Sequence, residues 1–276
     1  MYAHRVKPGE KVKLNDIPSK VDGGLTEKEA ERKCEELGEE LTDLQELLFA
    51  AGKTPLLIVL QGRDTSGKDG TIRHLLKYMN AQSTRVAPFK VPTPIELAHD
   101  YLWRVHSQTP GKGETVIFNR SHYEDVLVVR VHEFVAPDVW GKRFEHINNW
   151  EKLLTDSGTV VLKFMLHISK EEQERRLLDR ERDLEKAWKL SAGDWKEREF
   201  WDSYTEAYED VASKCSTESA PWHIISADHK WYRNLAITEA IVEAMRPLKK
   251  GWNAKLEEIG TKAKEDLAAF RAEAKS

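Results

Sequence analysis

Short apolar runs alternate with longer helical patterns along most of the chain. Continuous Leu, Ile and Val runs, such as LLIVLQ and VVLKFMLH, are typical of parallel strands that are covered on both faces. Because strands alternate with helices, we expect a doubly wound α/β fold with a five-stranded, mainly parallel sheet. The expected strands are residues 56–61, 85–89, 115–119, 160–167 and 223–227.

Helical periodicity predicts a long helix near each end of the chain. In the first helix, Thr26 and Glu29 are placed as a capping box, apolar residues recur at helical spacing, and Gly52 ends the pattern. Its apolar stripe favours packing on the chain's own core, and a subunit contact is the alternative. A second stripe begins at about Trp252 and is expected to pack on the body or on a neighbouring subunit. The two stripes favour a homo-oligomer, either a dimer or a tetramer.

We expect residues 1–276 to form a single domain. Residues 1–24 are interrupted by two prolines and are predicted to be an irregular surface arm. Residues from about 169 to 213 are predicted to form a lid region, and residues from about 251 to 276 a C-terminal helix.

Composition narrows the classes of partner. The chain is 40% hydrophobic and 33% charged, with a formal net charge of −4, as in ordinary globular proteins. Proteins that coat nucleic acid or membranes are usually basic, so we expect neither partner, and a bound anion needs a local cluster of positive charge. Cys34 and Cys215 lie far apart without a CxxC spacing, which disfavours a disulfide framework or a zinc site. With no apolar leader and no long apolar run, the chain is predicted to be cytoplasmic.

The strongest local signal is a glycine-rich segment between a buried strand and a helix. It follows the pattern G-x-x-x-x-G-K, in which backbone N–H groups and the helix N-terminus surround phosphate and the lysine adds a point charge. A tight turn without a ligand is the alternative. We assign phosphate or polyphosphate contacts to Gly62, Arg63, Thr65, Ser66, Gly67, Lys68, Asp69 and Gly70.

Two acids in this segment depart from the usual pattern. Asp69 stands where a metal-binding Ser or Thr normally follows the lysine, and Asp64 lies inside the loop. Carboxylates beside a phosphate site would repel the ligand unless a cation lies between them. We therefore expect a divalent metal, Mg²⁺ or alternatively Mn²⁺, with Asp64 among its ligands.

A second polar segment, NRSHYED, follows the expected strand at residues 115–119. Ligands of open α/β sheets bind beyond the carboxyl ends of the strands, so this segment should face the glycine-rich loop. Arg120 offers a planar guanidinium to phosphate oxygens, and Glu124 or Asp125 could complete a metal site. The alternative is a helix N-terminus that merely carries charge.

Further along lies a mixed-charge helical run, RRLLDRERD, which begins at Arg175. Ser169 and Glu172 are placed as a capping box before it. Such a run is often a solvated face, and it also resembles the arginine-bearing lid that small-molecule kinases close over the transferring phosphate to exclude water. The residues alone leave both interpretations open, the solvated face and the lid.

Together these segments resemble the polyphosphate kinase 2 family over roughly residues 30–245. The matching motifs are GRDTSGKDGTIR in the loop, YLWRVH at 101–106, FNRSHYEDV at 118–126, and RLLDR with KAWKLSAGDW in the lid region. The resemblance implies a P-loop kinase-like fold, a three-layer α/β/α sandwich with a helical lid. It also implies Mg²⁺-dependent, reversible phosphoryl transfer between inorganic polyphosphate and AMP or ADP, giving ADP or ATP.

The resemblance also implies roles for single residues. Asp64 would bind metal, Lys68 and Arg120 would contact phosphate, and Arg180 would be the phosphate-binding arginine of the lid, which makes these four the catalytic candidates. Many family members carry Asp where this chain has Asn119, so Asp125 is the candidate replacement metal ligand. The asparagine, with its neighbours, resembles the class III subgroup that uses both AMP and ADP. The candidate nucleotide contacts are Asn119, Arg120, His122 and Glu124.

Two other functions remain alternatives. One is a P-loop kinase that uses ATP as donor and another small phosphorylated acceptor. The other is an inactive module that only binds polyphosphate, which the intact Lys68 and the surplus acids disfavour. Phosphoryl transfer between phosphate groups needs no side-chain nucleophile, so neither His106 nor His122 is assigned a phosphohistidine role.

Overall fold

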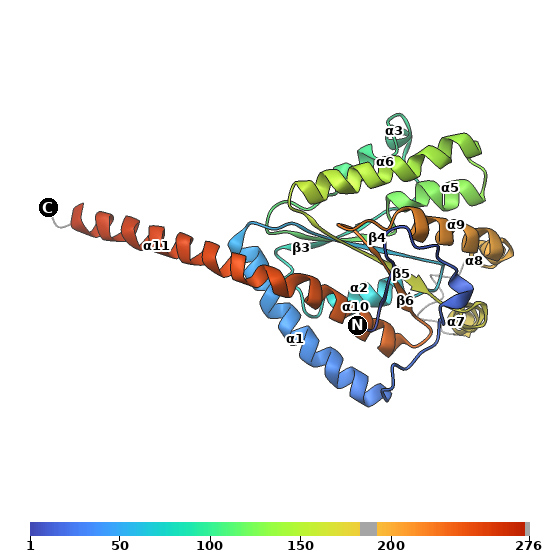
Figure 1. Ribbon diagram of the computed structural model, residues 1–276, viewed down its shortest axis with the longest axis horizontal. Coiled ribbons are helices and arrows are strands. Elements are labelled where there is room, and N and C mark those ends of the chain that lie inside the picture. The colour runs from blue at the N-terminus through green and yellow to red at the C-terminus, as the bar shows by residue number, and fades with distance from the viewer. Residues whose placement is uncertain (183–191, 274–276) are drawn as a thin grey trace.

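The computed structural model describes residues 1–182 and 192–273 (Figure 1). Its sheet has the order β1-β6-β5-β2-β4-β3, in which β1 is antiparallel to β6 and every other pair is parallel. The strands are β1 (His4–Arg5), β2 (Leu56–Gly62), β3 (Thr84–Pro88), β4 (Thr115–Asn119), β5 (Val160–His167) and β6 (Trp222–Ser226). The three-layer α/β/α class and the five predicted strands are confirmed.

The sheet has one strand more than the five predicted, because part of the N-terminal arm is not irregular. His4 and Arg5 pair with Ile224 and His223, so the arm adds a short antiparallel strand at the edge of the sheet. Val6, which follows this strand, is fully buried. A strand of two residues is too short to show a periodic pattern, which explains why the sequence did not reveal it.

Helices cover both faces of the sheet (Figure 1). Leu56, Ile58 and Leu60 of β2 point into one core, and Leu57 and Val59 point into the other, as the two-residue period of a strand requires. The first core lies under α1 (Glu27–Ala51), α2 (Lys68–Leu75) and α10 (Lys230–Met245). The second lies under α6 (Pro137–Asp156) and α9 (Trp201–Lys214).

The remaining described elements are short, apart from the first lid helix and the last helix. They are η1 (Leu14–Asp16), α3 (Pro94–Leu97), α4 (Trp103–His106), η2 (His122–Val126), α5 (Val128–Val131), α7 (Lys170–Arg182), α8 (Ala192–Glu197), η4 (Arg198–Phe200), η5 (Arg246–Leu248) and α11 (Lys249–Glu273). The part of the lid region at 183–191, with the KAWKL motif, lies outside the described residues. None of the described helices is long and apolar enough to cross a membrane.

The first long helix matches its sequence pattern. Thr26 and Glu29 form the capping box, and Gly52 ends α1 in the left-handed conformation. The stripe that includes Cys34 and Leu41 is buried, which confirms packing on the chain's own core.

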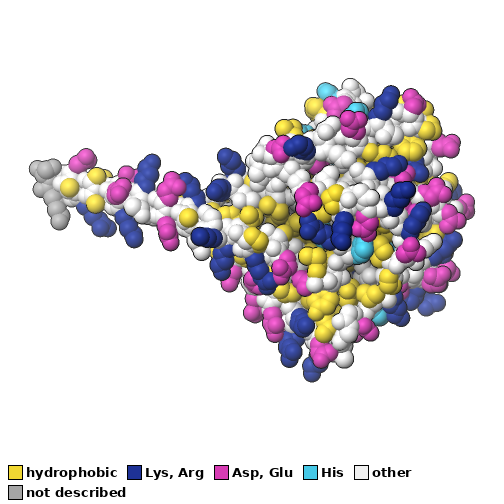
Figure 2. All heavy atoms as spheres, viewed as in Figure 1, with side chains coloured by type: hydrophobic (Ala, Val, Ile, Leu, Met, Phe, Trp, Pro, Cys, Tyr) yellow, Lys and Arg dark blue, Asp and Glu magenta, His cyan; other side chains and the backbone are white. Residues whose placement is uncertain are grey.

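The C-terminal helix contacts the body at its start and then projects from it (Figure 1). Trp252 is buried and donates from Nε1 to Thr54 Oγ1 (2.9 Å). Farther on, Ile259, Leu267 and Phe270 are exposed, and Figure 2 shows apolar side chains among charged ones on the projecting part. The predicted docking on the body therefore holds only near Trp252, and the homo-oligomer stays a prediction.

Close packing between α1 and the turn that follows α2 provides a test of the fold. A Cβ at Gly38 would lie 2.3 Å from the ring of Tyr78, whereas a Cβ at Gly141 of α6 would meet nothing within 4 Å. We expect Gly38→Ala to lower the free energy of unfolding by roughly 1–3 kcal/mol through overpacking. Gly141→Ala is the matched control and should raise it by up to about 1 kcal/mol. Urea unfolding measures both, and equal stability of the two variants would contradict the packing.

Candidate active site

The glycine-rich loop joins β2 to α2 through an unusual backbone. A Cβ at Gly62 would lie 2.7 Å from Ser66 Oγ and 2.8 Å from the Leu166 carbonyl oxygen, so only glycine fits there. Gly67, the N-cap of α2, has φ 106° and also favours glycine. Thr65 has φ 64°, a conformation that is costly for a β-branched residue and is found mainly at functional sites.

The carbonyl groups of the loop are bound by the first lid helix, α7. Gln173 donates to the carbonyl oxygen of Asp64 (3.1 Å), and Arg176 Nη1 donates to those of Thr65 and Ser66 (2.9 and 3.1 Å). Within the described residues, the N–H groups of Gly67, Lys68 and Gly70 have no hydrogen-bond acceptor. The loop therefore keeps its donors available for an anion at the start of α2.

Unpartnered hydroxyl groups fit the same ligand. Thr65 Oγ1, Ser66 Oγ and Thr71 Oγ1 are buried without a hydrogen-bond partner among the described residues. Buried hydroxyls of this kind are rare in folded proteins, where such groups are nearly always satisfied. Their position on the loop and the first turn of α2 is suited to phosphate oxygens.

Lys68 lies inside the loop, as predicted for its phosphate lysine. Its Nζ donates to the carbonyl oxygens of Gly62 (2.6 Å) and Arg63 (3.1 Å). Burial, and after it the nearby Arg120 guanidinium, lowers the pKa of Lys68 to about 8. An anionic ligand would raise this pKa again, so binding of phosphate and protonation of Lys68 favour each other.

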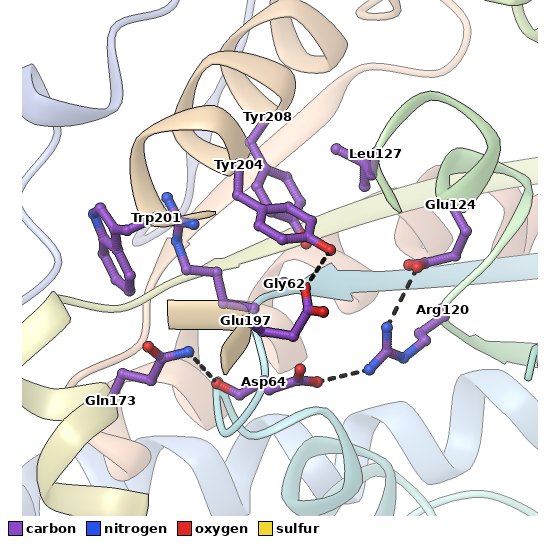
Figure 3. Close-up of a pocket in the computed structure, with 11 residues that line it drawn as sticks. Gly62, Asp64, Arg120, Glu124, Leu127, Gln173, Glu197, Trp201, Tyr204 and Tyr208 are labelled. Carbon is purple, nitrogen blue, oxygen red and sulfur yellow. Dashed lines mark hydrogen bonds and ion pairs between the residues drawn. The ribbon is translucent and has the colours of Figure 1, made fainter. Parts of the chain in front are cut away.

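Arg120 links the two polar segments (Figure 3). It donates from Nη2 to Asp64 Oδ1 (2.6 Å) and from Nη1 to Glu124 Oε2 (3.3 Å). Burial opposes its charge, but Glu124 and Asp64 hold the pKa of Arg120 above its usual value. Its φ of 63° is a second strained position next to the loop. The structure thus brings Asp64 together with Arg120 and Glu124, which lie far from it in the sequence.

Asn119 lies beside Asp69, which the sequence did not pair with it. Asn119 Nδ2 donates to Asp69 Oδ1 (3.1 Å). The acid missing at the end of β4 is therefore matched by an acid at the start of α2. Asp69 stands where a Ser or Thr is usual, and Asn119 stands where an Asp is usual. These two departures together were the signal in the sequence that could have revealed the pair.

Asp125 was the sequence-based candidate for the missing metal ligand, and the structure places it elsewhere. Its carboxylate accepts a hydrogen bond from Arg143 Nη1 (2.9 Å), and it does not line the pocket at Asp64. Burial raises the pKa of Asp125 to about 6, although Arg143 acts in the opposite direction. The metal role of Asp125 stays a prediction, and Asp69, which lies in the first turn of α2, is a second candidate ligand.

His122 also differs from its predicted role as a nucleotide contact. Its ring is fully buried, and Nε2 lies 3.2 Å from Glu151 Oε1. The same carboxylate accepts from Tyr123 Oη (2.7 Å), and Lys163 Nζ donates to its other oxygen (2.6 Å). His122 follows Arg120 by two residues, and its ring belongs to this buried network. It therefore supports the segment at 119–125 from inside and does not face a ligand.

Arg180, the predicted lid arginine, is paired with an acid that sequence reasoning missed. Arg180 Nη1 donates to Asp194 Oδ2 (2.9 Å) across the two described parts of the lid region. Burial and the nearby Asp64 raise the pKa of Asp194, while Arg180 lowers it. At the base of α7 only half of the predicted capping box exists: Glu172 N donates to Ser169 Oγ (3.1 Å), but the Glu172 carboxylate binds Arg175 and Arg176.

One wall of the pocket is formed by aromatic residues of α9 (Figure 3). Trp201, Tyr204 and Tyr208 recur at helical spacing and line the pocket with Asp64 and Arg120. The sequence contains this spacing, which could have indicated a common face. The pocket also includes Leu127, Gln173 and two acids, Glu124 and Glu197.

Arg63 turns towards this wall instead of the phosphate side of the loop. Its guanidinium lies 3.8 Å from the ring centre of Trp201 and donates to Thr205 Oγ1. Burial lowers the pKa of Arg63 to about 10. Arg63 was predicted to contact phosphate. Its side chain points away from the loop, so only its backbone is placed for such a contact.

The acids at the loop fit a divalent metal only in part. No group of three or more His, Cys, Asp or Glu side chains in residues 1–182 and 192–273 is arranged to hold a metal ion. Asp64 and Asp69 nevertheless lie beside the loop donors. Mg²⁺ commonly takes one or two carboxylates and completes its shell with substrate phosphates and water, so these residues fit a metal that arrives with its phosphate ligand.

Comparisons with known proteins agree with this geometry. Residues 24–251 match the family described as Polyphosphate kinase 2 (PPK2). The AMP/ADP-polyphosphate phosphotransferase of Meiothermus ruber is 49% identical over 90% of this chain and 94% of its own length. The ADP-polyphosphate phosphotransferase of Rhodopseudomonas palustris is 42% identical over 89% of each chain.

Solved structures show the same relationship. The crystal structure of Polyphosphate Kinase 2 from Arthrobacter aurescens TC1 superposes with a TM-score of 0.84 at 39% identity, over 88% of both chains. That of a putative polyphosphate kinase 2 from Pseudomonas aeruginosa PA01 gives 0.80 at 30% identity, over 88% of this chain and 52% of the other. With the family match spanning most of the chain, this protein belongs to the polyphosphate kinase 2 family.

Proposed function

We propose that this protein catalyses reversible phosphoryl transfer between inorganic polyphosphate and AMP or ADP. The observation that carries the proposal is the loop at the start of α2, where free N–H groups and buried hydroxyls adjoin Lys68 and Arg120. The printed names of the Meiothermus ruber and Rhodopseudomonas palustris relatives support the substrate pair. Family membership supports the reaction class.

In the forward direction, the loop holds the end of the polyphosphate chain. Loop N–H groups and the hydroxyls of Thr65 and Ser66 bind its phosphate oxygens, and Lys68 and Arg120 neutralise negative charge there. An oxygen of the acceptor phosphate attacks the terminal phosphorus of the chain, in line with the bond to the next phosphate. That bond breaks, and polyphosphate shortened by one unit leaves. Catalysis then depends on positioning and on positive charge at the equatorial oxygens, since no covalent intermediate with the protein is needed.

We propose that Mg²⁺ binds with the phosphates, and Mn²⁺ could replace it. Asp64 and Asp69 would hold the ion, in place of the sequence-based pair of Asp64 and Asp125. When bound, the ion supplies charge neutralisation and orientation of phosphate oxygens. Asp64 would then share its carboxylate between the ion and Arg120, and the guanidinium would have donors available for phosphate.

The pocket beside Arg120 is our candidate acceptor site. The aromatic wall of Trp201, Tyr204 and Tyr208 offers apolar faces to a base, and Arg120 offers donors to the acceptor phosphate. Asn119 would place a neutral amide near these phosphates, where the family resemblance implies an acid in many members. One site could then accept either a monophosphate or a diphosphate.

The lid would complete the site on substrate binding. Arg180 is held by Asp194 in this structure, and phosphate is a competing partner of higher charge. We propose that Arg180 leaves Asp194 for the transferring phosphate when both substrates are bound. Closure excludes water, which would otherwise take the phosphoryl group.

One assay tests the proposal against its alternatives. Purified protein is incubated with AMP, Mg²⁺ and polyphosphate in the absence of ATP, and ADP and ATP are measured. Formation of both products is expected. Turnover with ATP but not with polyphosphate would favour the ordinary small-molecule kinase, and polyphosphate binding without any turnover would favour the inactive binding module.

Lys68→Met should reduce turnover by roughly 10²–10³-fold, because a charged contact in a water-poor site is lost. The wild-type kcat/KM should fall as pH rises through about 8, since Lys68 is protonated below its pKa and neutral above it. The variant should lack this decline. Steady-state kinetics between pH 6 and 9.5 provide the check, and a residual rate within a few-fold of wild type would contradict the role of Lys68.

Asp64→Asn should lower the rate by roughly 100-fold, and added Mg²⁺ or Mn²⁺ should restore little, because the residue both binds metal and orients Arg120. Asp43→Asn, on the exposed face of α1, is the matched control and should retain wild-type activity. The measurement is initial rate against metal concentration. An Asp64→Asn protein that kept its rate and bound polyphosphate more tightly would mean that the acid is only a repulsive neighbour.

Asn119→Asp should restrict the enzyme towards one acceptor. A carboxylate at this position would face Asp69 and would change the charge and the metal position beside the acceptor phosphates. We expect the ratio of kcat/KM for AMP to that for ADP to shift by about tenfold or more, which corresponds to about 1.4 kcal/mol. ADP should inhibit wild-type AMP phosphorylation competitively. Equal losses with both acceptors, or two activities that do not compete, would contradict a single acceptor site.

A further inference from the structure

Arg233 lies against the phosphate loop from the side of α10. Its side chain is buried, with 3% of its surface exposed, and Nη1 is 2.0 Å from the position that a Cβ on Gly67 would take. Nη2 lies 3.3 Å from the corresponding position at Gly70. Both glycines therefore make room for this guanidinium at the start of α2.

The guanidinium of Arg233 is only partly satisfied by the protein. Nε and Nη2 share one acceptor, Asn234 Oδ1, at 3.2 and 2.8 Å. Across the described part of the chain, Nη1 has no hydrogen-bond acceptor, and Arg233 has no carboxylate partner. Leaving a buried cation without a counter-charge is costly, so an anion is expected as its partner.

The charges around Arg233 also favour an anion as its partner. Burial, followed by the charges of Arg176 and Arg73, lowers the pKa of Arg233 to about 10. Arg120, by contrast, lies between two carboxylates, and Arg180 is paired with Asp194. Arg233 thus differs from the two arginines of the active site in having positive neighbours and free donor capacity.

Two exposed cations extend from this point along α2 and beyond it. Arg73 is exposed on α2, and Lys77 is exposed in the turn that follows this helix. Neither forms an ion pair within the described residues. We call Arg233, Arg73 and Lys77 the cation line.

We propose that the cation line binds the part of the polyphosphate chain that lies beyond the transferring phosphate. The proposal rests on the proposed function for the identity of the polyanion. Arg233 contacts phosphates next to those held by the loop at Gly67 and Gly70, and Arg73 and Lys77 contact phosphates farther along.

The geometry favours the donor chain over the acceptor nucleotide. The cation line lies on the face of the sheet covered by α2 and α10, whereas the aromatic wall of the acceptor pocket belongs to α9 on the other face (Figure 1). Arg73 lies near enough to Arg233 to lower its pKa, and Lys77 lies in the turn that follows α2. A repeating phosphate polymer can contact all three cations at once, while a single mononucleotide has too few phosphates to do so.

The test compares donors of different length in matched variants. KM and kcat are measured with tripolyphosphate and with long-chain polyphosphate for wild type, Arg233→Gln and the double variant Arg73→Gln/Lys77→Gln. Arg246→Gln is the control, because Arg246 is an exposed arginine that follows α10 and pairs with Glu40. Thermal melting of every variant accompanies the kinetics.

We expect Arg233→Gln to raise the KM for long chains by roughly tenfold or more, with a much smaller change in kcat. The double variant should raise the KM for long chains several-fold and leave the KM for tripolyphosphate within about twofold of wild type. Its KM for long chains should also depend less on salt than that of wild type, since fewer charges take part. The control should match wild type with both donors.

Unchanged KM for long chains in the double variant and in a folded Arg233→Gln protein would overturn the proposal. Equal increases for short and long donors in both variants would also overturn it, because they would indicate a general effect on the loop. If Arg233→Gln melts at a much lower temperature, the double variant on the surface decides the question. Absence of wild-type turnover with any polyphosphate would instead refute the proposed function.

Discussion

The buried guanidinium of Arg176 connects the segments on which the active site depends. It donates to the carbonyl oxygens of Thr65 and Ser66 in the phosphate loop, and from Nη2 to those of Ala227 and Asp228 (2.6 and 3.0 Å) before α10. Its Nε donates to Glu172 (2.6 Å) of its own helix, α7. One side chain thus joins the lid, the loop and the end of β6. Because charge-assisted hydrogen bonds are strong in a buried setting, this contact holds the loop carbonyls on the α7 side.

The arginines of the candidate site are paired with acids that a phosphate chain could replace. Arg120 is neutralised by Asp64 and Glu124, and Arg180 by Asp194. A phosphate chain, together with the metal proposed above, would replace these internal contacts without leaving a buried charge unpaired. This arrangement explains how a chain with a net charge of −4 can present a site for a highly anionic substrate. Arg233 is different, since its charge has no carboxylate partner among residues 1–182 and 192–273.

The accuracy of the sequence-based predictions depended on how local each feature is. The buried runs of β2 and β5 and the capping box of Thr26 and Glu29 depend on neighbouring residues, and the structure confirms them. The glycine-rich motif identified the loop because its backbone geometry requires glycine at Gly62 and Gly67. Roles of single polar side chains were less predictable. Asp125 and His122 have suitable chemistry, but Arg143 and Glu151 engage them away from the pocket.

The sequence alone determined the layered α/β class, the phosphate loop with Lys68, and the polar segment at Arg120, because periodicity, backbone freedom and motif spacing are properties of consecutive residues. Only the tertiary structure decided which side chains meet. It placed Asp69 beside Asn119, Arg180 beside Asp194, and Arg233 against Gly67, and it paired the arm with β6. These contacts join residues that are distant along the chain, and their partners depend on packing, burial and charge in three dimensions, which no local pattern contains.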